Sequence, residues 1–134
     1  MKYETIIGIE IHCELKTKTK MFSGAPTSFG EVANTCVNEI DLGHPGTLPC
    51  VNKEAVRLAI LAATALKCEI DPLVKFDRKN YYYSDLPKGF QITQDKRPIG
   101  RNGYLDIEVD GVVTRVEIER LHMEEDTAKQ FHFD

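Results

Sequence analysis

The chain has 134 residues, 42% hydrophobic and 28% charged, with a formal net charge of −4. This length suits one domain with one hydrophobic core. No apolar run is long enough to span a membrane, and no signal-peptide pattern is present. We therefore expect a cytoplasmic protein with no membrane partner. The four cysteines form no Cys-x-x-Cys pair, which excludes a zinc knuckle and a thioredoxin-like motif.

The first predicted element is a strand over residues 6–15, in which apolar residues alternate with Glu10, His12 and Glu14. A strand sends successive side chains to opposite faces, so these three side chains share one row above an apolar face. Such a row suits a metal ion. The alternative is that the row is simply the exposed polar face of an edge strand.

An irregular segment and a helix follow. Residues 22–50 contain seven glycines and prolines, which permits only short strands and turns. A long loop of this kind in a compact domain is usually functional or disordered. Asn52 is a suitable N-cap for a helix over residues 53–67, whose composition leaves only a thin polar stripe. We expect this helix to be largely buried and to end before Asp71-Pro72.

A hairpin is predicted near the carboxyl end. Residues 104–109 and 112–119 alternate around Asp110-Gly111, a sequence typical of a type I′ turn. Pairing Val109 with Val112 puts the apolar residues on one face and sets Asp106 opposite Arg115. Beyond Glu119 the alternation changes phase, which predicts a bulge or bend near residue 120.

A second acidic cluster, His122-Met-Glu-Glu-Asp126, follows the hairpin. Two carboxylates 4 Å apart repel by about 4 kcal/mol at an effective dielectric constant of 20, so grouped acids take up protons or recruit a cation. We therefore predict a cation site divided between this cluster and the first strand. Carboxylates suit magnesium, whereas an imidazole ligand suits zinc or manganese, so the residue types leave the metal open.

Charge is unevenly distributed along the chain. Residues 75–101 hold seven basic and three acidic side chains, whereas residues 102–134 hold three basic and nine acidic ones. A cationic segment facing an anionic one fits a phosphate and its metal. Within the first segment, Lys88 precedes Gly89, where a backbone can approach a phosphate closely, and Lys79 adds positive charge. The other interpretation is a β segment followed by a turn with solvated lysines.

Several segments of the sequence resemble those of a known protein family. The matching segments run in family order along nearly the whole chain: Ile7-Gly-Ile-Glu-Ile-His-Cys-Glu-Leu-Lys-Thr17, Met21-Phe-Ser-Gly-Ala-Pro26, Leu42-Gly-His-Pro-Gly-Thr-Leu-Pro49, Phe76 to Gln94, and His122-Met-Glu-Glu-Asp126. They resemble the amino-terminal part of the B subunit of the aspartyl/glutamyl-tRNA amidotransferases. The chain departs from the family pattern at Ser84 and at Thr127-Ala128, which affects only the local backbone.

The resemblance implies a fold and a domain organisation. Members have a cradle domain, a helical domain and a tail, and residues 1–134 correspond to the amino-terminal part of the cradle, without the rest of the cradle or the other two domains. The implied fold is α+β, a mostly antiparallel sheet with a buried helix, similar to the catalytic domain of glutamine synthetase and guanidino kinases. The predicted strands, helix and hairpin agree with that class.

The resemblance also implies an ATP-dependent carbon–nitrogen ligase. In this reaction ATP phosphorylates the side-chain carboxylate of Glu-tRNA(Gln) or Asp-tRNA(Asn), and ammonia from the amidase subunit replaces the phosphate. The implied cofactors are magnesium and ATP, and the implied partners are the amidase subunit, the small C subunit and the mischarged tRNA. The expected site residues are Glu10, His12 and Glu125 as metal ligands, Lys79 and Glu125 in catalysis, and Lys88, Tyr81 and Tyr82 as cofactor contacts.

A non-catalytic role is the alternative. The chain could serve as a docking module for the amidase and small C subunits, with its acidic and basic side chains as polar interface groups. We also expect the 134-residue chain alone to be inactive, because the tRNA-binding regions and part of the pocket are missing from it.

Overall fold

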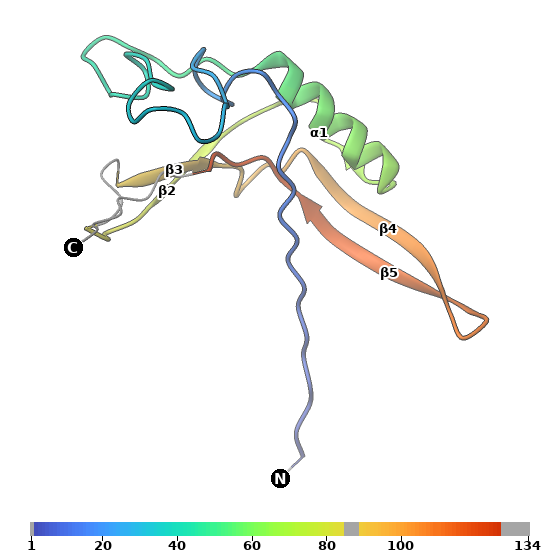
Figure 1. The fold of residues 1–134 in the computed structure, drawn as a ribbon. Coiled ribbons are helices and arrows are strands. Elements are labelled where there is room, and N and C mark those ends of the chain that lie inside the picture. The colour runs from blue at the N-terminus through green and yellow to red at the C-terminus, as the bar shows by residue number, and fades with distance from the viewer. Residues whose placement is uncertain (1, 85–88, 127–134) are drawn as a thin grey trace.

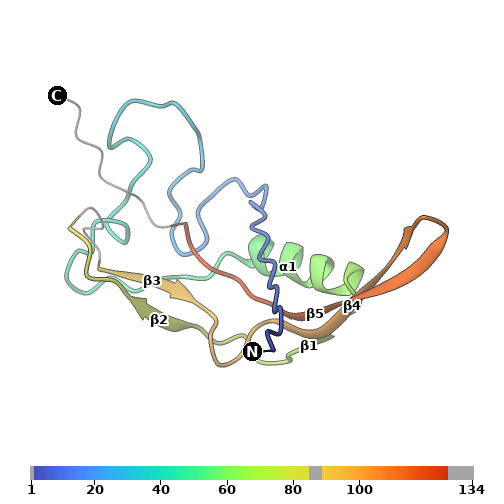
Figure 2. The same ribbon diagram turned by 90° about the horizontal axis from the view of Figure 1, so that it is seen from below.

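A computed structural model of the chain describes residues 2–84 and 89–126 (Figures 1 and 2). Its elements, in chain order, are α1 (Lys53–Ala65), β1 (Glu69–Ile70), β2 (Asp77–Asn80), β3 (Phe90–Thr93), β4 (Gly100–Val109) and β5 (Val112–Leu121). Strands β1, β4 and β5 form an antiparallel sheet in the order β1-β4-β5, and β2 pairs antiparallel with β3. The α+β class and the antiparallel pairing are confirmed; the finer likeness to glutamine synthetase stays a prediction.

Helix α1 confirms the predicted N-cap and corrects the predicted end. Oδ1 of Asn52 accepts hydrogen bonds from the backbone N–H groups of Glu54 and Ala55. The helix ends at Ala65, two residues before the predicted end at residue 67, because Lys67 adopts a φ of 55°, and not because of Asp71-Pro72 further along the chain. The N–H of Cys68 then donates to Ala63 O over 2.8 Å, which completes a Schellman-type cap.

The expectation that α1 is largely buried was wrong. Only one face is covered, at Ala55, Ala59 and Ala63, whereas Ile60 and Leu61 keep 38% and 57% of their surface exposed. These small residues let the helix lie close over the base of β4 (Figure 1). The apolar residues on the other faces have too few neighbours within the described residues to be covered.

The predicted strand over residues 6–15 is absent as well. Residues 2–17 form neither helix nor strand, and in Figure 1 the first of them run away from the rest of the chain as an extended segment. The intended apolar face is solvated, with Ile9 84% and Ile11 85% exposed. The alternation is correct for a strand, but a strand requires a hydrogen-bonded neighbour, and the described residues supply none for this segment.

The long irregular segment is confirmed, because residues 22–50 contain only turns, bends and one isolated bridge. Asp41 orders this segment by contacts with residues before it in the sequence. Its carboxylate accepts from Ser23 Oγ over 3.0 and 2.9 Å and from the backbone N–H of Asn38 over 3.0 Å, and it pairs with Lys20 Nζ at 3.3 Å. The loop is therefore held by side-chain contacts in place of a strand ladder.

The hairpin has the predicted register, with Val109 opposite Val112 and Asp106 opposite Arg115. Nε of Arg115 donates to Asp106 Oδ1 over 2.7 Å. Both strands are longer than predicted, and the expected bulge near residue 120 is absent, since the same register continues to Leu121. The irregularity lies on β4 instead, at Asn102, whose φ is 53°.

The core joins α1 to the ends of the strands. Ala55, Ala59, Ile99 and Met123 form a buried cluster, and the partly buried side chains of Leu15, Met21, Val56, Phe76 and Leu121 pack against it. No helix of residues 2–84 and 89–126 combines the length and the apolar character needed to cross a membrane.

Gly103 marks a close approach between β4 and the end of α1, and this contact can be tested. A Cβ at Gly103 would lie 2.5 Å from Cys68 Sγ and 2.7 Å from Leu66 O. We expect Gly103→Ala to lower the free energy of unfolding, measured by urea denaturation, by about 1–3 kcal/mol. Gly8→Ala is the control, because no atom lies within 4 Å of its added methyl group. Equal stability of the two variants would contradict this packing.

The ion pair between Asp71 and Arg97 predicts a pH dependence. Arg97 Nη2 donates to Asp71 Oδ1 over 2.6 Å, and this contact, with the backbone N–H of Leu73, lowers the pKa of Asp71 to about 2. A carboxylate whose pKa is lower in the folded than in the unfolded state stabilises the fold above its unfolded pKa, near 4, and stops doing so as the pH falls to about 2. Urea denaturation of Asp71→Asn should thus show a shallower loss of stability between pH 4 and pH 2 than the wild type. An identical slope would disprove this contribution.

Candidate functional site

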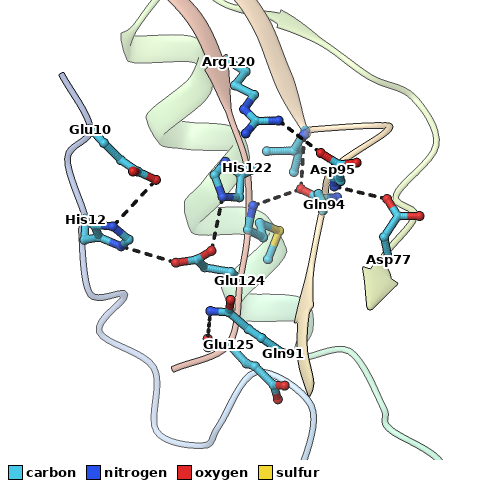
Figure 3. A network of polar contacts seen from close by, with 12 residues as sticks. Glu10, His12, Asp77, Gln91, Gln94, Asp95, Arg120, His122, Glu124 and Glu125 are labelled. Atoms are coloured by element: carbon cyan, nitrogen blue, oxygen red, sulfur yellow. Dashed lines mark hydrogen bonds and ion pairs between the residues drawn. The ribbon is translucent and has the colours of Figure 1, made fainter. Parts of the chain in front are cut away.

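Two groups of polar side chains lie beside the end of β5; Figure 3 draws the first group and, from the second, Gln91 and Glu125. We call the first the imidazole–carboxylate cluster; it consists of Glu10, His12, His122 and Glu124. We call the second the β3 bridge; it consists of Lys79, Tyr81, Gln91 and Glu125. Together they contain five of the seven residues that the sequence analysis named as site residues.

The imidazole–carboxylate cluster joins the extended amino-terminal segment to the chain after β5. His12 Nδ1 lies 3.3 Å from Glu124 Oε1, and His12 Nε2 lies 3.8 Å from Glu10 Oε1. On the other side, His122 Nε2 lies 3.3 Å from Glu124 Oε2. Glu10 and His12 therefore lie in one row as predicted, and the predicted convergence of the amino-terminal segment with residues 122–126 is present (Figure 3).

The carboxylate that meets His12 belongs to Glu124 and not to Glu125. Glu125 faces β3 instead, where its Oε1 accepts from the backbone N–H of Ile92 over 2.8 Å and its own N–H donates to Ile92 O over 3.0 Å. Glu14, the third residue of the predicted row, lines a groove of about 580 Å³ against α1, together with Arg57 and Leu61.

The donor types of the cluster suit a divalent cation, but their arrangement is incomplete. Carboxylate oxygens and imidazole nitrogens are ordinary metal ligands. Within the described residues, however, no three His, Cys, Asp or Glu side chains are grouped closely enough to hold a metal ion. The roles of Glu10, His12 and Glu125 as metal ligands therefore stay predictions.

The β3 bridge is centred on a buried amide. Gln91 is 7% exposed; its Oε1 accepts from the Tyr81 hydroxyl over 3.0 Å, and its Nε2 donates to Glu125 O over 2.8 Å. Lys79 is the partner of Gln91 across the β2–β3 ladder, so the two side chains share a face. The Lys79 ammonium lies 5.5 Å from the centre of the Tyr81 ring.

The two groups are linked electrostatically through Lys79. The neighbouring Tyr81 side chain raises the pKa of Lys79 most, and the charges of Glu124 and Glu10 raise it further. Lys79 therefore stays protonated at neutral pH. An exposed ammonium with a raised pKa is suited to binding an anion such as a phosphate and unsuited to acting as a base.

The other two predicted site residues, Tyr82 and Lys88, belong to neither group. Tyr82 is 94% exposed and Tyr83 67% exposed, and the expected contact of Tyr82 with a cofactor stays a prediction. Lys88 lies outside the described residues, so its expected contact with a cofactor stays a prediction.

Sequence reasoning missed the two buried amides of β3 and its end, Gln91 and Gln94. Gln94 is 1% exposed; its Oε1 accepts from the N–H groups of Ile99 and Met123, and its Nε2 donates to Lys75 O. The sequence carried little signal: Gln91 lies between apolar Phe90 and Ile92, but Gln94 lies between the polar Thr93 and Asp95. Buried amides are kept where they complete hydrogen bonds, and these partners are distant in the sequence. Gln94 thus fixes the start of the segment that carries Glu124 and Glu125.

Gln94 predicts a large effect on stability. Gln94→Met keeps the approximate shape but leaves two buried N–H donors, those of Ile99 and Met123, without their acceptor. Each unsatisfied buried donor costs about 1–3 kcal/mol, so we expect a decrease of about 2–5 kcal/mol in the free energy of unfolding, measured by urea denaturation. A decrease below about 1 kcal/mol would show that water or another group replaces the amide.

Comparison with known proteins extends these observations. The sequence profile described as "GatB/GatE catalytic domain" matches residues 5–134. Over 132 residues, the chain is 63% identical to the B subunit of the aspartyl/glutamyl-tRNA(Asn/Gln) amidotransferase of Mesoplasma florum. The protein of the same description from Bacillus licheniformis is 58% identical over 132 residues. Each alignment covers 98% of this chain, and the chain spans 28% of the length of either relative.

Proposed function

Because the chain belongs to the GatB/GatE catalytic domain family, we propose that it forms part of an ATP-dependent tRNA amidotransferase. It is the amino-terminal part of the B subunit, and the whole subunit phosphorylates the side-chain carboxylate of Glu-tRNA(Gln) or Asp-tRNA(Asn). Ammonia then displaces the phosphate, which yields the amide. The proposed partners are the amidase subunit, the small C subunit and the mischarged tRNA.

The reaction has a clear electrostatic requirement. A carboxylate is a poor acyl donor, so it must be converted to an acyl phosphate before ammonia can attack. Phosphoryl transfer depends mainly on positioning and on neutralising the phosphate charge. The single observation that carries the proposal is the arrangement of Lys79, a protonated cation, beside Tyr81 on one side and within the field of Glu10 and Glu124 on the other.

We assign roles on this basis. Lys79 binds a phosphate oxygen, Tyr81 and Tyr82 contact ATP, and Lys88 contributes a second cation. Glu125 acts in catalysis beside Lys79. In the cell, the amidotransferase works in the cytoplasm.

Magnesium is proposed from the donor types alone. Glu10, His12 and Glu125 are the proposed ligands, and Glu124, 3.3 Å from His12, is a further one. Magnesium would neutralise phosphate charge when bound. The described residues do not gather three donors, so complete coordination requires ligands from the rest of the protein or a turn of the Glu125 side chain.

A second candidate function is supported by the exposed apolar side chains. Ile6, Ile7, Ile9 and Ile11 are 80–88% exposed, and large solvated apolar groups often mark contact surfaces. On this alternative the chain is a docking module for the amidase and small C subunits, without a catalytic role. A docking module has no need to bind ATP, so nucleotide binding separates the two functions.

The decisive experiment is calorimetric titration of the full-length protein with ATP in the presence of excess magnesium. Lys79→Met should lower the affinity for ATP by about 10- to 150-fold, because a charge-assisted hydrogen bond to phosphate contributes about 1.5–3 kcal/mol. Lys53→Met is the matched control, since Lys53 is an exposed lysine at the start of α1. If the wild type binds no ATP, or if the two variants bind ATP equally, the catalytic proposal fails.

A further inference from the structure

Gln91 occupies a position that the proposed reaction does not itself explain. Its side chain is buried, yet it is not needed for the β2–β3 ladder, which is formed by backbone groups. Both ends of the amide are used: one contacts Tyr81 and the other contacts Glu125. These two partners lie ten residues before it and 34 residues after it in the sequence.

The chemistry of the partners fixes the direction of these hydrogen bonds. The backbone carbonyl of Glu125 can only accept, so the Gln91 Nε2 must face it. Gln91 Oε1 is then the acceptor for the Tyr81 hydroxyl. Because the hydroxyl proton is committed to Gln91, the lone pairs of the Tyr81 oxygen stay available to accept from Lys79.

The result is a chain of donors that all point in one direction. Tyr81 donates to Gln91, and Gln91 donates to the backbone of Glu125, while the Lys79 ammonium lies 5.5 Å from the centre of the Tyr81 ring at the start of this path. A carboxylate at position 91 could not donate to Glu125. An apolar side chain could neither donate to Glu125 nor accept from Tyr81. Only a side chain with both a donor and an acceptor completes this path.

We propose that Gln91 is a positioning residue that holds the ATP-contacting phenol of Tyr81 in register with Glu125. This inference rests on the proposed function, since it concerns residues assigned there to ATP and to the metal. Gln91 itself touches neither ligand. Its role is to fix the distance between the nucleotide side and the carboxylate side of the site.

The inference is tested on the full-length protein with two probes. The affinity for Mn²⁺ is measured without nucleotide, and the affinity for ATP is measured in excess Mg²⁺, both by calorimetry. Gln91→Met removes both hydrogen bonds at similar volume and should lower both affinities about tenfold, the effect of losing about 1.4 kcal/mol of positioning. Tyr81→Phe should lower the ATP affinity alone, because the contact of Gln91 with Glu125 persists.

The double variant distinguishes coupling from independent effects. If Gln91 acts on ATP through Tyr81, adding Gln91→Met to Tyr81→Phe should lower the ATP affinity no further. Additive losses overturn the inference. Ala65→Gly is the control for a purely structural effect, since Ala65 is an exposed residue of α1 outside the buried cluster; glycine weakens the helix but should leave both affinities unchanged.

Each remaining outcome is also decisive. If Gln91→Met binds Mn²⁺ and ATP with the same affinities as the wild type, this inference is overturned, but the proposed function is not. No binding of ATP by the wild type overturns the proposed function and this inference together. If Gln91→Met does not fold, Gln91→Thr replaces it, because the shorter side chain reaches neither Tyr81 nor Glu125, and the same predictions apply.

Discussion

The described structure depends on the buried amide of Gln94. It is almost completely enclosed, and it joins three segments: residue 75 before β2, residue 99 before β4, and residue 123 after β5. Without it, the backbone N–H groups of Ile99 and Met123 would be left unpaired in the core. Because Ile99 and Met123 also belong to the hydrophobic cluster with Ala55 and Ala59, a single side chain couples the packing of α1 to the position of the candidate site.

The β4–β5 sheet shows how this core limits the rest of the fold. At its base, Gly100 pairs with Leu121, and this end lies under α1. Toward the Asp110-Gly111 turn, the apolar side chains lie on the opposite face of the sheet from Leu121. Ile107 and Val112 are among them and are 42% and 64% exposed. The sheet therefore turns one apolar side toward the helix and another away from it. The change of phase that predicted a bulge reflects this exchange of apolar sides in a ladder that keeps one register on both sides of Asn102.

The sequence correctly predicted those elements whose hydrogen bonds join residues that are close together in the chain. The Asn52 cap and the Asp110-Gly111 turn each act within a few residues, and both are present. The strand over residues 6–15 was predicted from alternation alone, and it is absent because its ladder needs a distant neighbour. The roles of Gln91 and Gln94 could not be read from sequence either, since their partners lie up to 34 residues away.

The same reasoning explains which acid meets His12. Met123 is 3% exposed and packs in the core, and alternate residues of an extended chain face opposite sides. His122 and Glu124 therefore face away from the core, toward His12, while Glu125 faces the same side as Met123 and reaches β3. The burial of one methionine thus divides neighbouring carboxylates between the imidazole–carboxylate cluster and the β3 bridge. The sequence predicts that the two acidic segments meet, but the assignment of each acid follows only once the buried side of residues 121–125 is known.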